Sequence, residues 1–210
     1  MNVFISGGAK CGKSSLAQDL AAALSSGGKR YYVATMIPTG EEDQERIRRH
    51  IADRAGLGFE TVECYDHILS VANKDGMFLV DNITSLIQNT LFPAEKNYEM
   101  DLDAADRCAD ELIGFAGVVR HAIFVSDYIY SDIRTLNVIP KASKCTASAW
   151  LRLTAVWRPS ATRSLKWRPD RSSFIKEICA YENLPSCVCH VPEHVLRHSC
   201  ATDLGREGEG

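Results

Sequence analysis

Short apolar runs alternate with amphipathic segments along the first 133 residues of the chain. The β-rich runs predict strands at residues 3–5, 31–35, 59–63, 77–81 and 122–126. Helical periodicity predicts helices at residues 16–24, 41–54, 67–72, 83–91 and 101–115. Strands that alternate with helices are typical of a parallel, doubly wound sheet. We therefore predict an α/β fold with a mostly parallel sheet and a ligand at the carboxyl ends of its strands.

The loop after the first strand, residues 7–14, follows the pattern G-x-x-x-x-G-K-[ST] of a P-loop. Its glycines let the backbone turn with N–H groups pointing inward, where they cradle phosphate oxygens. The flanking strand and helix disfavour the alternative of a glycine-rich turn that matches by chance. The predicted nucleotide-binding residues of this glycine loop are Gly7, Gly8, Ala9, Lys10, Cys11, Gly12, Lys13 and Ser14.

Two side chains are predicted to serve the phosphates and their Mg²⁺ ion. Lys13 would reach the β- and γ-phosphates, and the hydroxyl of Ser14 would bind Mg²⁺. Asp81 ends an apolar strand, where P-loop proteins place an Asp that holds Mg²⁺ or its water shell. An acid there is also a common turn residue, but together with the glycine loop we interpret Asp81 as a second Mg²⁺ ligand. The chain is thus predicted to be a P-loop NTPase that binds a nucleoside triphosphate.

Composition narrows the class of protein further. A net charge of −3 and a pI of about 6.1 give no sign of a nucleic-acid or anionic-membrane surface. No apolar run approaches the roughly 20 residues that span a bilayer. Because the chain opens directly on a strand and the glycine loop, we expect no signal peptide and a cytoplasmic protein.

Five motifs occur in a characteristic order: the glycine loop, Tyr-x-Ala-Thr at 32–35, Arg-Ile-x-x-His-x-x-x-Arg at 46–54, Thr-Val-Glu at 61–63 and Leu-Val-Asp-x-x-Thr at 79–84. This order resembles the bifunctional adenosylcobinamide kinase/adenosylcobinamide-phosphate guanylyltransferases of cobalamin biosynthesis. The resemblance implies that adenosylcobinamide is first phosphorylated from ATP or GTP. It then implies that GTP guanylylates His50 and that the GMP passes to the cobinamide phosphate.

The resemblance also implies roles for individual residues. Arg46 and Arg54 lie one turn on either side of His50 and would clamp phosphate oxygens, so that these three and Lys13 form the predicted catalytic set. Thr35 and Glu63 would bind nucleotide together with the glycine loop and Asp81. The expected assembly is a homo-oligomer, with the trimer as the expected form. Outside the Arg-Ile-x-x-His-x-x-x-Arg motif, His50 would be interpreted as a solvated histidine on a charged helix. His67 and His121 have no motif, and we interpret them as histidines without a catalytic role.

Two alternatives stay open from the sequence. The chain could be a P-loop NTPase or kinase with another acceptor, or an inactive, truncated relative that only binds nucleotide. One departure bears on both. After the last predicted strand the family often has Ser-Asn-Glu-Val-Gly, whereas residues 126–130 read Ser-Asp-Tyr-Ile-Tyr, which displaces the acid.

Residues 134–210 differ from the P-loop nucleotide-binding domain predicted for residues 1–133. Apolar periodicity fades there, and Trp, Arg, Ser, Pro and Cys become frequent. We interpret this segment as an atypical, poorly ordered tail, and one hypothesis is a frameshift near residue 134. Read from the third base of each codon, residues 144–177 permit an amphipathic helix followed by a β-rich strand.

A rival interpretation of the tail is a zinc site, because its Cys and His residues are of the metal-binding type. Three of its histidines would share one helical face. Their spacing is not one of the recurring zinc patterns. The candidate ligands are Cys187, Cys189, His190, His194, His198 and Cys200.

Overall fold

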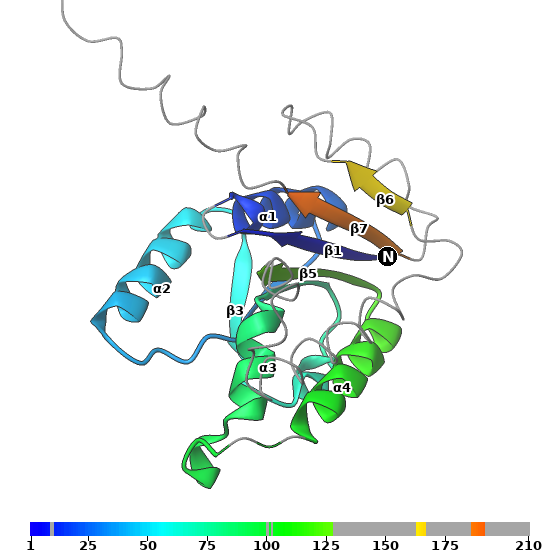
Figure 1. The fold of residues 1–210 in the computed structure, drawn as a ribbon. Helices are drawn as coiled ribbons and strands as arrows, with labels where there is room; N and C mark the ends of the chain where they lie inside the picture. Colours follow the sequence, from blue (N-terminus) through cyan, green and yellow to red (C-terminus); the bar gives the residue numbers. More distant parts are fainter. Residues whose placement is uncertain (9–10, 100, 102, 128–162, 167–185, 192–210) are drawn as a thin grey trace, which may run out of the picture.

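The computed structural model describes residues 1–8, 11–99, 101, 103–127, 163–166 and 186–191 (Figure 1). In these ranges the elements follow the order β1 (Asn2–Gly7), α1 (Lys13–Leu24), β2 (Arg30–Ala34), α2 (Glu41–Asp53), β3 (Phe59–Glu63), η1 (Ile68–Val71), β4 (Met77–Asp81), α3 (Ile83–Leu91), η2 (Ala94–Lys96), α4 (Ala104–Val118), β5 (His121–Asp127), β6 (Arg163–Lys166) and β7 (Ser186–Val191). The elements predicted within the first 133 residues are all present, with shifted ends. The predicted helix at 67–72 is the 3-10 helix η1.

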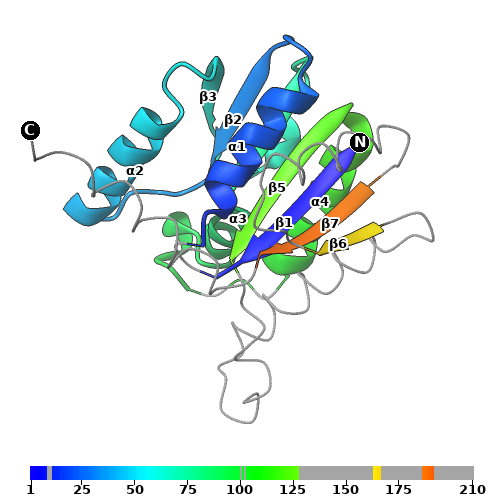
Figure 2. The same ribbon diagram turned by 90° about the horizontal axis from the view of Figure 1, so that it is seen from above.

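The strands form one sheet in the order β3-β2-β4-β5-β1-β7-β6, and each of these pairings is parallel. Side chains alternate between its two faces, so that Val3 and Ile5 pack with α1 while Phe4 packs with η1, α3 and α4. Figure 1 shows α1 on one side of the sheet and α3 and α4 on the other, and Figure 2 shows the strands side by side. The predicted α/β doubly wound fold is therefore confirmed.

The strands β6 and β7 come from the segment in which the sequence shows no regular pattern. β7 pairs with β1 along the whole of Asn2–Gly7. His190 lies in this strand, so the predicted helical face of histidines does not include it. His194, His198 and Cys200 lie outside the described residues, and the described ranges contain no group of three or more His, Cys, Asp or Glu that could hold a metal ion. A frameshift and the boundary at residue 134 stay predictions.

The helix α2 stands apart from the layers that cover the sheet, beside the edge formed by β3 (Figure 1). None of its residues from Glu41 to Asp53 is buried. Asp43 helps to start it, since its carboxylate accepts hydrogen bonds from the Thr39 backbone N–H at 3.0 Å and hydroxyl at 2.7 Å. None of the helices in the described ranges is long and apolar enough to cross a membrane.

Candidate functional site

The glycine loop joins the carboxyl end of β1 to the start of α1, as predicted. Gly12 has a φ of 78°, a left-handed conformation that suits glycine, and the first residue of α1 follows it directly. Lys13 is buried, and its Nζ donates a hydrogen bond to the Gly8 carbonyl at 3.1 Å. Ser14 lies in the first turn of α1, whereas Ala9 and Lys10 lie outside the described residues. The loop therefore places a lysine and a helix N-terminus at the carboxyl edge of the sheet.

Asp127, at the end of β5, is the partner of Lys13. One carboxylate oxygen lies 2.7 Å from Lys13 Nζ, and the other accepts a hydrogen bond from Asn82 Nδ2 at 3.0 Å. Its backbone N–H donates to the Thr84 hydroxyl at 3.1 Å. In the sequence this residue stood out only as a displaced acid, because its nearness to Lys13 depends on β5 pairing with β1. The structure thus brings a third acid to the site beside Asp81 and Glu63.

A cleft of about 780 Å³ opens at the carboxyl ends of β2, β4 and β5. Its lining includes Asp127, Asn82, Arg46, Tyr65 and His67. Its volume lies within the range of roughly 300–1,000 Å³ that is usual for small-molecule sites. The position agrees with the ligand site predicted for a doubly wound sheet.

A smaller pocket of about 90 Å³ lies between α2 and the ends of β2, β3 and β4. It gathers five of the predicted site residues, which come from three separate motifs: Arg46, His50, Arg54, Glu63 and Asp81. It shares part of its lining with the large cleft: Met36, Arg46, Tyr65, Asn82 and Ser85. The two spaces are therefore neighbours, and the half-buried His50 faces the smaller one.

Asp81 and Arg54 both engage Tyr32 in this pocket. The Tyr32 hydroxyl donates to the Asp81 carboxylate at 2.9 Å, and burial together with this negative charge raises the pKa of Tyr32 well above its usual value, which keeps it a donor. The Arg54 guanidinium lies 4.0 Å from the centre of the Tyr32 ring and donates to the Thr61 hydroxyl at 2.9 Å. Arg54 is buried although the helix before it is not. It therefore attaches the end of α2 to the sheet.

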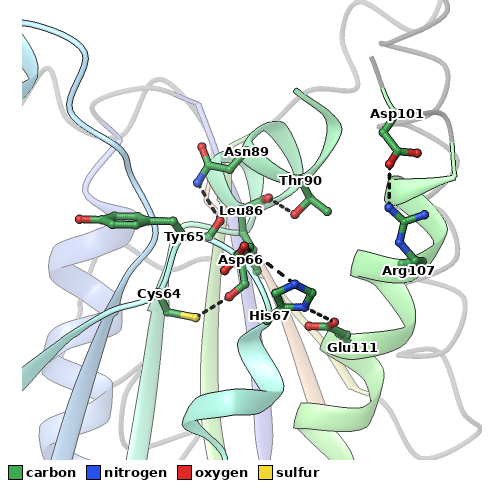
Figure 3. Close-up of polar contacts among 10 residues, drawn as sticks. All are labelled: Cys64, Tyr65, Asp66, His67, Leu86, Asn89, Thr90, Asp101, Arg107 and Glu111. Carbon is green, nitrogen blue, oxygen red and sulfur yellow. Dashed lines mark hydrogen bonds and ion pairs between the residues drawn. The ribbon is translucent and has the colours of Figure 1, made fainter. Parts of the chain in front are cut away.

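Thr35 is fully buried and serves the backbone at the end of β4. Its hydroxyl donates to the Asn82 carbonyl at 2.7 Å and accepts from the Asn82 N–H at 2.8 Å. Asn89 donates to the Thr35 carbonyl at 2.8 Å and to the Tyr65 carbonyl at 3.0 Å, the second of which Figure 3 shows. These hydrogen bonds fix the loops that lie between the large cleft and the smaller pocket. A direct contact of Thr35 with nucleotide stays a prediction.

His67 lines the large cleft and lies between two acids (Figure 3). Its Nδ1 is 2.9 Å from Glu111, and its Nε2 is 3.9 Å from Asp66. The hydrogen bond and charge of Glu111, with a smaller effect of Asp66, raise the pKa of His67 above its usual value. No sequence motif distinguishes this histidine, and its closer partner, Glu111, is remote in the chain.

The donor set at the carboxyl edge suits Mg²⁺. The hydroxyl of Ser14 and the carboxylate of Asp81 are hard oxygen donors of the kind that Mg²⁺ prefers, and they would hold the ion beside a bound triphosphate. In this structure the Asp81 carboxylate is engaged by Tyr32 and lines the smaller pocket. Its predicted role at the metal, with Ser14, stays a prediction.

Comparison with known proteins identifies relatives of the chain. A family model described as cobinamide kinase / cobinamide phosphate guanyltransferase matches residues 3–142. No curated protein sequence matches the chain significantly. Among solved structures, the chain is similar to the flagellar accessory protein FlaH from Methanocaldococcus jannaschii, with 17% identity, a TM-score of 0.38 and coverage of 70% of this chain and 67% of that one.

Proposed function

The chain belongs to the cobinamide kinase / cobinamide phosphate guanyltransferase family, and from this premise we propose that it performs both reactions of adenosylcobinamide activation. The first is phosphorylation of the aminopropanol hydroxyl from ATP or GTP. The second is transfer of GMP from GTP, through a guanylylated His50, to adenosylcobinamide phosphate. The family match supports the pathway and the use of nucleotides. The gathering of Arg46, His50, Arg54, Glu63 and Asp81 around one pocket supports the histidine route.

In the kinase reaction the glycine loop binds the triphosphate through its backbone N–H groups and the N-terminus of α1. Lys13 leaves the Asp127 carboxylate and follows the phosphates, because its present partners, Gly8 and Asp127, lie at the mouth of the loop. A bound Mg²⁺, held by Ser14 and Asp81, supplies charge neutralisation. The large cleft takes the corrinoid, since it adjoins Asp127 and has the volume for a small molecule.

In the guanylyl reaction a neutral ring nitrogen of His50 attacks the α-phosphorus of GTP. The bond from that phosphorus to the pyrophosphate breaks, a phosphorus–nitrogen bond forms, and the imidazole loses its remaining N–H proton to solvent. A phosphate oxygen of the acceptor then attacks the same phosphorus and displaces the histidine. Arg46, which lines both spaces, stabilises the charge on the transferred group in this proposal.

The test uses GTP labelled at the α-phosphate. The protein is incubated with labelled GTP and Mg²⁺, denatured, and examined for acid-labile, base-stable label. His50→Asn is expected to abolish the label, while His67→Asn, a change of the other cleft histidine, keeps it. Lys13→Ala is expected to reduce nucleotide binding itself. Nucleotide binding without label in the wild type would favour a P-loop NTPase with another acceptor or an inactive relative.

Two further proposals concern the whole chain. We expect a cytoplasmic homotrimer. Light scattering of the purified protein tests the expected oligomeric state. The frameshift hypothesis for residues 134–210 is tested by sequencing the gene. An intact frame, with the same tail in related genes, would reject it.

A further inference from the structure

We propose that Asp127 is the general base of the kinase reaction, a role that rests on the proposed function. Its carboxylate is paired with Lys13 at 2.7 Å. A triphosphate competes for the same lysine with several negatively charged oxygens. When Lys13 turns to the phosphates, it leaves one oxygen of Asp127 without its cation at the mouth of the cleft.

The freed oxygen has a fixed direction. Asn82 Nδ2 donates to the other oxygen of the carboxylate at 3.0 Å, and the Asp127 N–H is bonded to Thr84. Asn82 is itself buried and held as the N-cap of α3, since its side-chain oxygen accepts from the Ser85 N–H at 2.7 Å. The carboxylate is therefore oriented by a rigid helix start and does not depend on Lys13 for its position.

The distances suit proton transfer. From the present position of Lys13 Nζ, 2.7 Å from Asp127, a phosphate oxygen at an ordinary hydrogen-bond length lies within about 6 Å of the Asp127 oxygen, and a shift of Lys13 toward the phosphates lengthens this gap. That gap accommodates one hydroxyl oxygen, at about 2.7 Å from the carboxylate and about 3–3.5 Å from the phosphorus. As the hydroxyl oxygen bonds to the γ-phosphorus, the bond from that phosphorus to the β–γ bridging oxygen breaks and the nucleoside diphosphate leaves. Asp127 takes the proton of the hydroxyl group and later releases it to water.

The other acids of the cleft, within the described residues, are committed elsewhere or lie apart from the glycine loop. Asp43 is bonded to Thr39, Glu111 to His67, and Asp101 to Lys96 and Arg107. Asp127 is the acid of this lining that contacts Lys13. The acid that the family often has one position later is Tyr128 in this chain, so the carboxylate available at the end of β5 is that of Asp127.

The experiment measures Asp127→Asn, which keeps an oxygen to accept from Asn82, against Glu60→Gln, a change of an exposed acid that pairs with Lys74 and lines neither the cleft nor the smaller pocket. With adenosylcobinamide and MgATP, Asp127→Asn is expected to lower kcat by at least about 100-fold. Its affinity for MgATP stays the same or increases, because Lys13 loses its competitor. Labelling of His50 from GTP is retained, and Glu60→Gln changes none of these quantities.

Each other outcome overturns the inference. A kcat within about threefold of wild type excludes a base at Asp127. If Asp127→Asn binds nucleotide more weakly only when Mg²⁺ is present, Asp127 is a metal ligand. If the variant also loses the labelling of His50, the role of Asp127 is structural. Asp127→Ser is measured alongside, so that the conclusion does not depend on the folding of one variant. A wild type that transfers no phosphoryl group to adenosylcobinamide contradicts the proposed function and this inference with it.

Discussion

Replacing Arg54 by Met is expected to loosen α2, the helix that contains His50, without unfolding the sheet. Residues 41–53 of this helix are all exposed or only partly buried. Arg54, the buried residue at its end, contacts the Tyr32 ring at 4.0 Å and the Thr61 hydroxyl at 2.9 Å. Met is unbranched and fills similar space but makes neither polar contact.

The magnitude follows from these two contacts. A cation–π contact at a largely buried site contributes about 1 kcal/mol. The hydrogen bond to Thr61 contributes about 1 kcal/mol more. A loss of about 2 kcal/mol corresponds to roughly a 30-fold increase in the opening of α2, since each 1.4 kcal/mol is a factor of ten.

Amide hydrogen exchange followed by mass spectrometry measures this opening. Amides of residues 41–53 should exchange up to about 30-fold faster in Arg54→Met, while those of α3 stay unchanged. Arg48→Met is the control, because the ion pair of Arg48 with Glu45 on the same helix is exposed and contributes little. Unchanged exchange in α2, or an equal increase in α3, would refute the reasoning. Loss of guanylylation with unchanged exchange would instead support the phosphate clamp predicted from the sequence.

Three other predictions concern the core and the titrating groups. Phe115→Ala should lower the free energy of unfolding, measured in urea, by about 3–5 kcal/mol. The reason is that this ring is fully buried and packs edge-on against two other phenylalanines. A loss below about 1 kcal/mol would contradict that packing. Burial raises the pKa of Cys64 to about 11 and that of Cys108 to about 12. At pH 8 both thiols should therefore react with iodoacetamide at least about 100-fold more slowly in the folded protein than in urea. Equal rates would be inconsistent with their burial. Glu111→Gln should lower the pKa of His67 in an NMR titration, and an unchanged titration would exclude the contact. Because the pKa of His67 is raised in the folded protein, the stabilisation by this pair is present below the usual value near 6.5 and is lost as pH rises through the folded pKa.

Local patterns were enough to predict the sheet strands of residues 1–127 and the glycine loop, because apolar runs and glycine spacing act over a few residues. The i, i+4 spacing of Arg46 and His50 also placed both on the face of α2 that lines the smaller pocket. Helix ends were less predictable. α4 begins at Ala104 and not at Asp101, because ahead of the helix the Asp101 carboxylate accepts from the Asp103 N–H at 3.1 Å and from Lys96.

The remaining features depend on strand order and long-range packing. Asp127 reaches Lys13 because β5 lies next to β1, a neighbour relation that no local pattern encodes. Arg54 shares its face with His50 in the sequence, yet it turns onto Tyr32 from the end of the helix. The strand β7 was not expected, since its sequence has no clear alternation of apolar and polar residues.

The central claim is that GMP becomes bonded to His50, and peptide mapping tests it most directly. The protein is incubated with GTP and Mg²⁺, digested under alkaline conditions that preserve a phosphoramidate, and analysed by mass spectrometry. The account predicts one GMP adduct on the peptide from α2, located at His50 by fragmentation and absent without Mg²⁺. An adduct on another residue, or none while GTP binding to the glycine loop is intact, would contradict it.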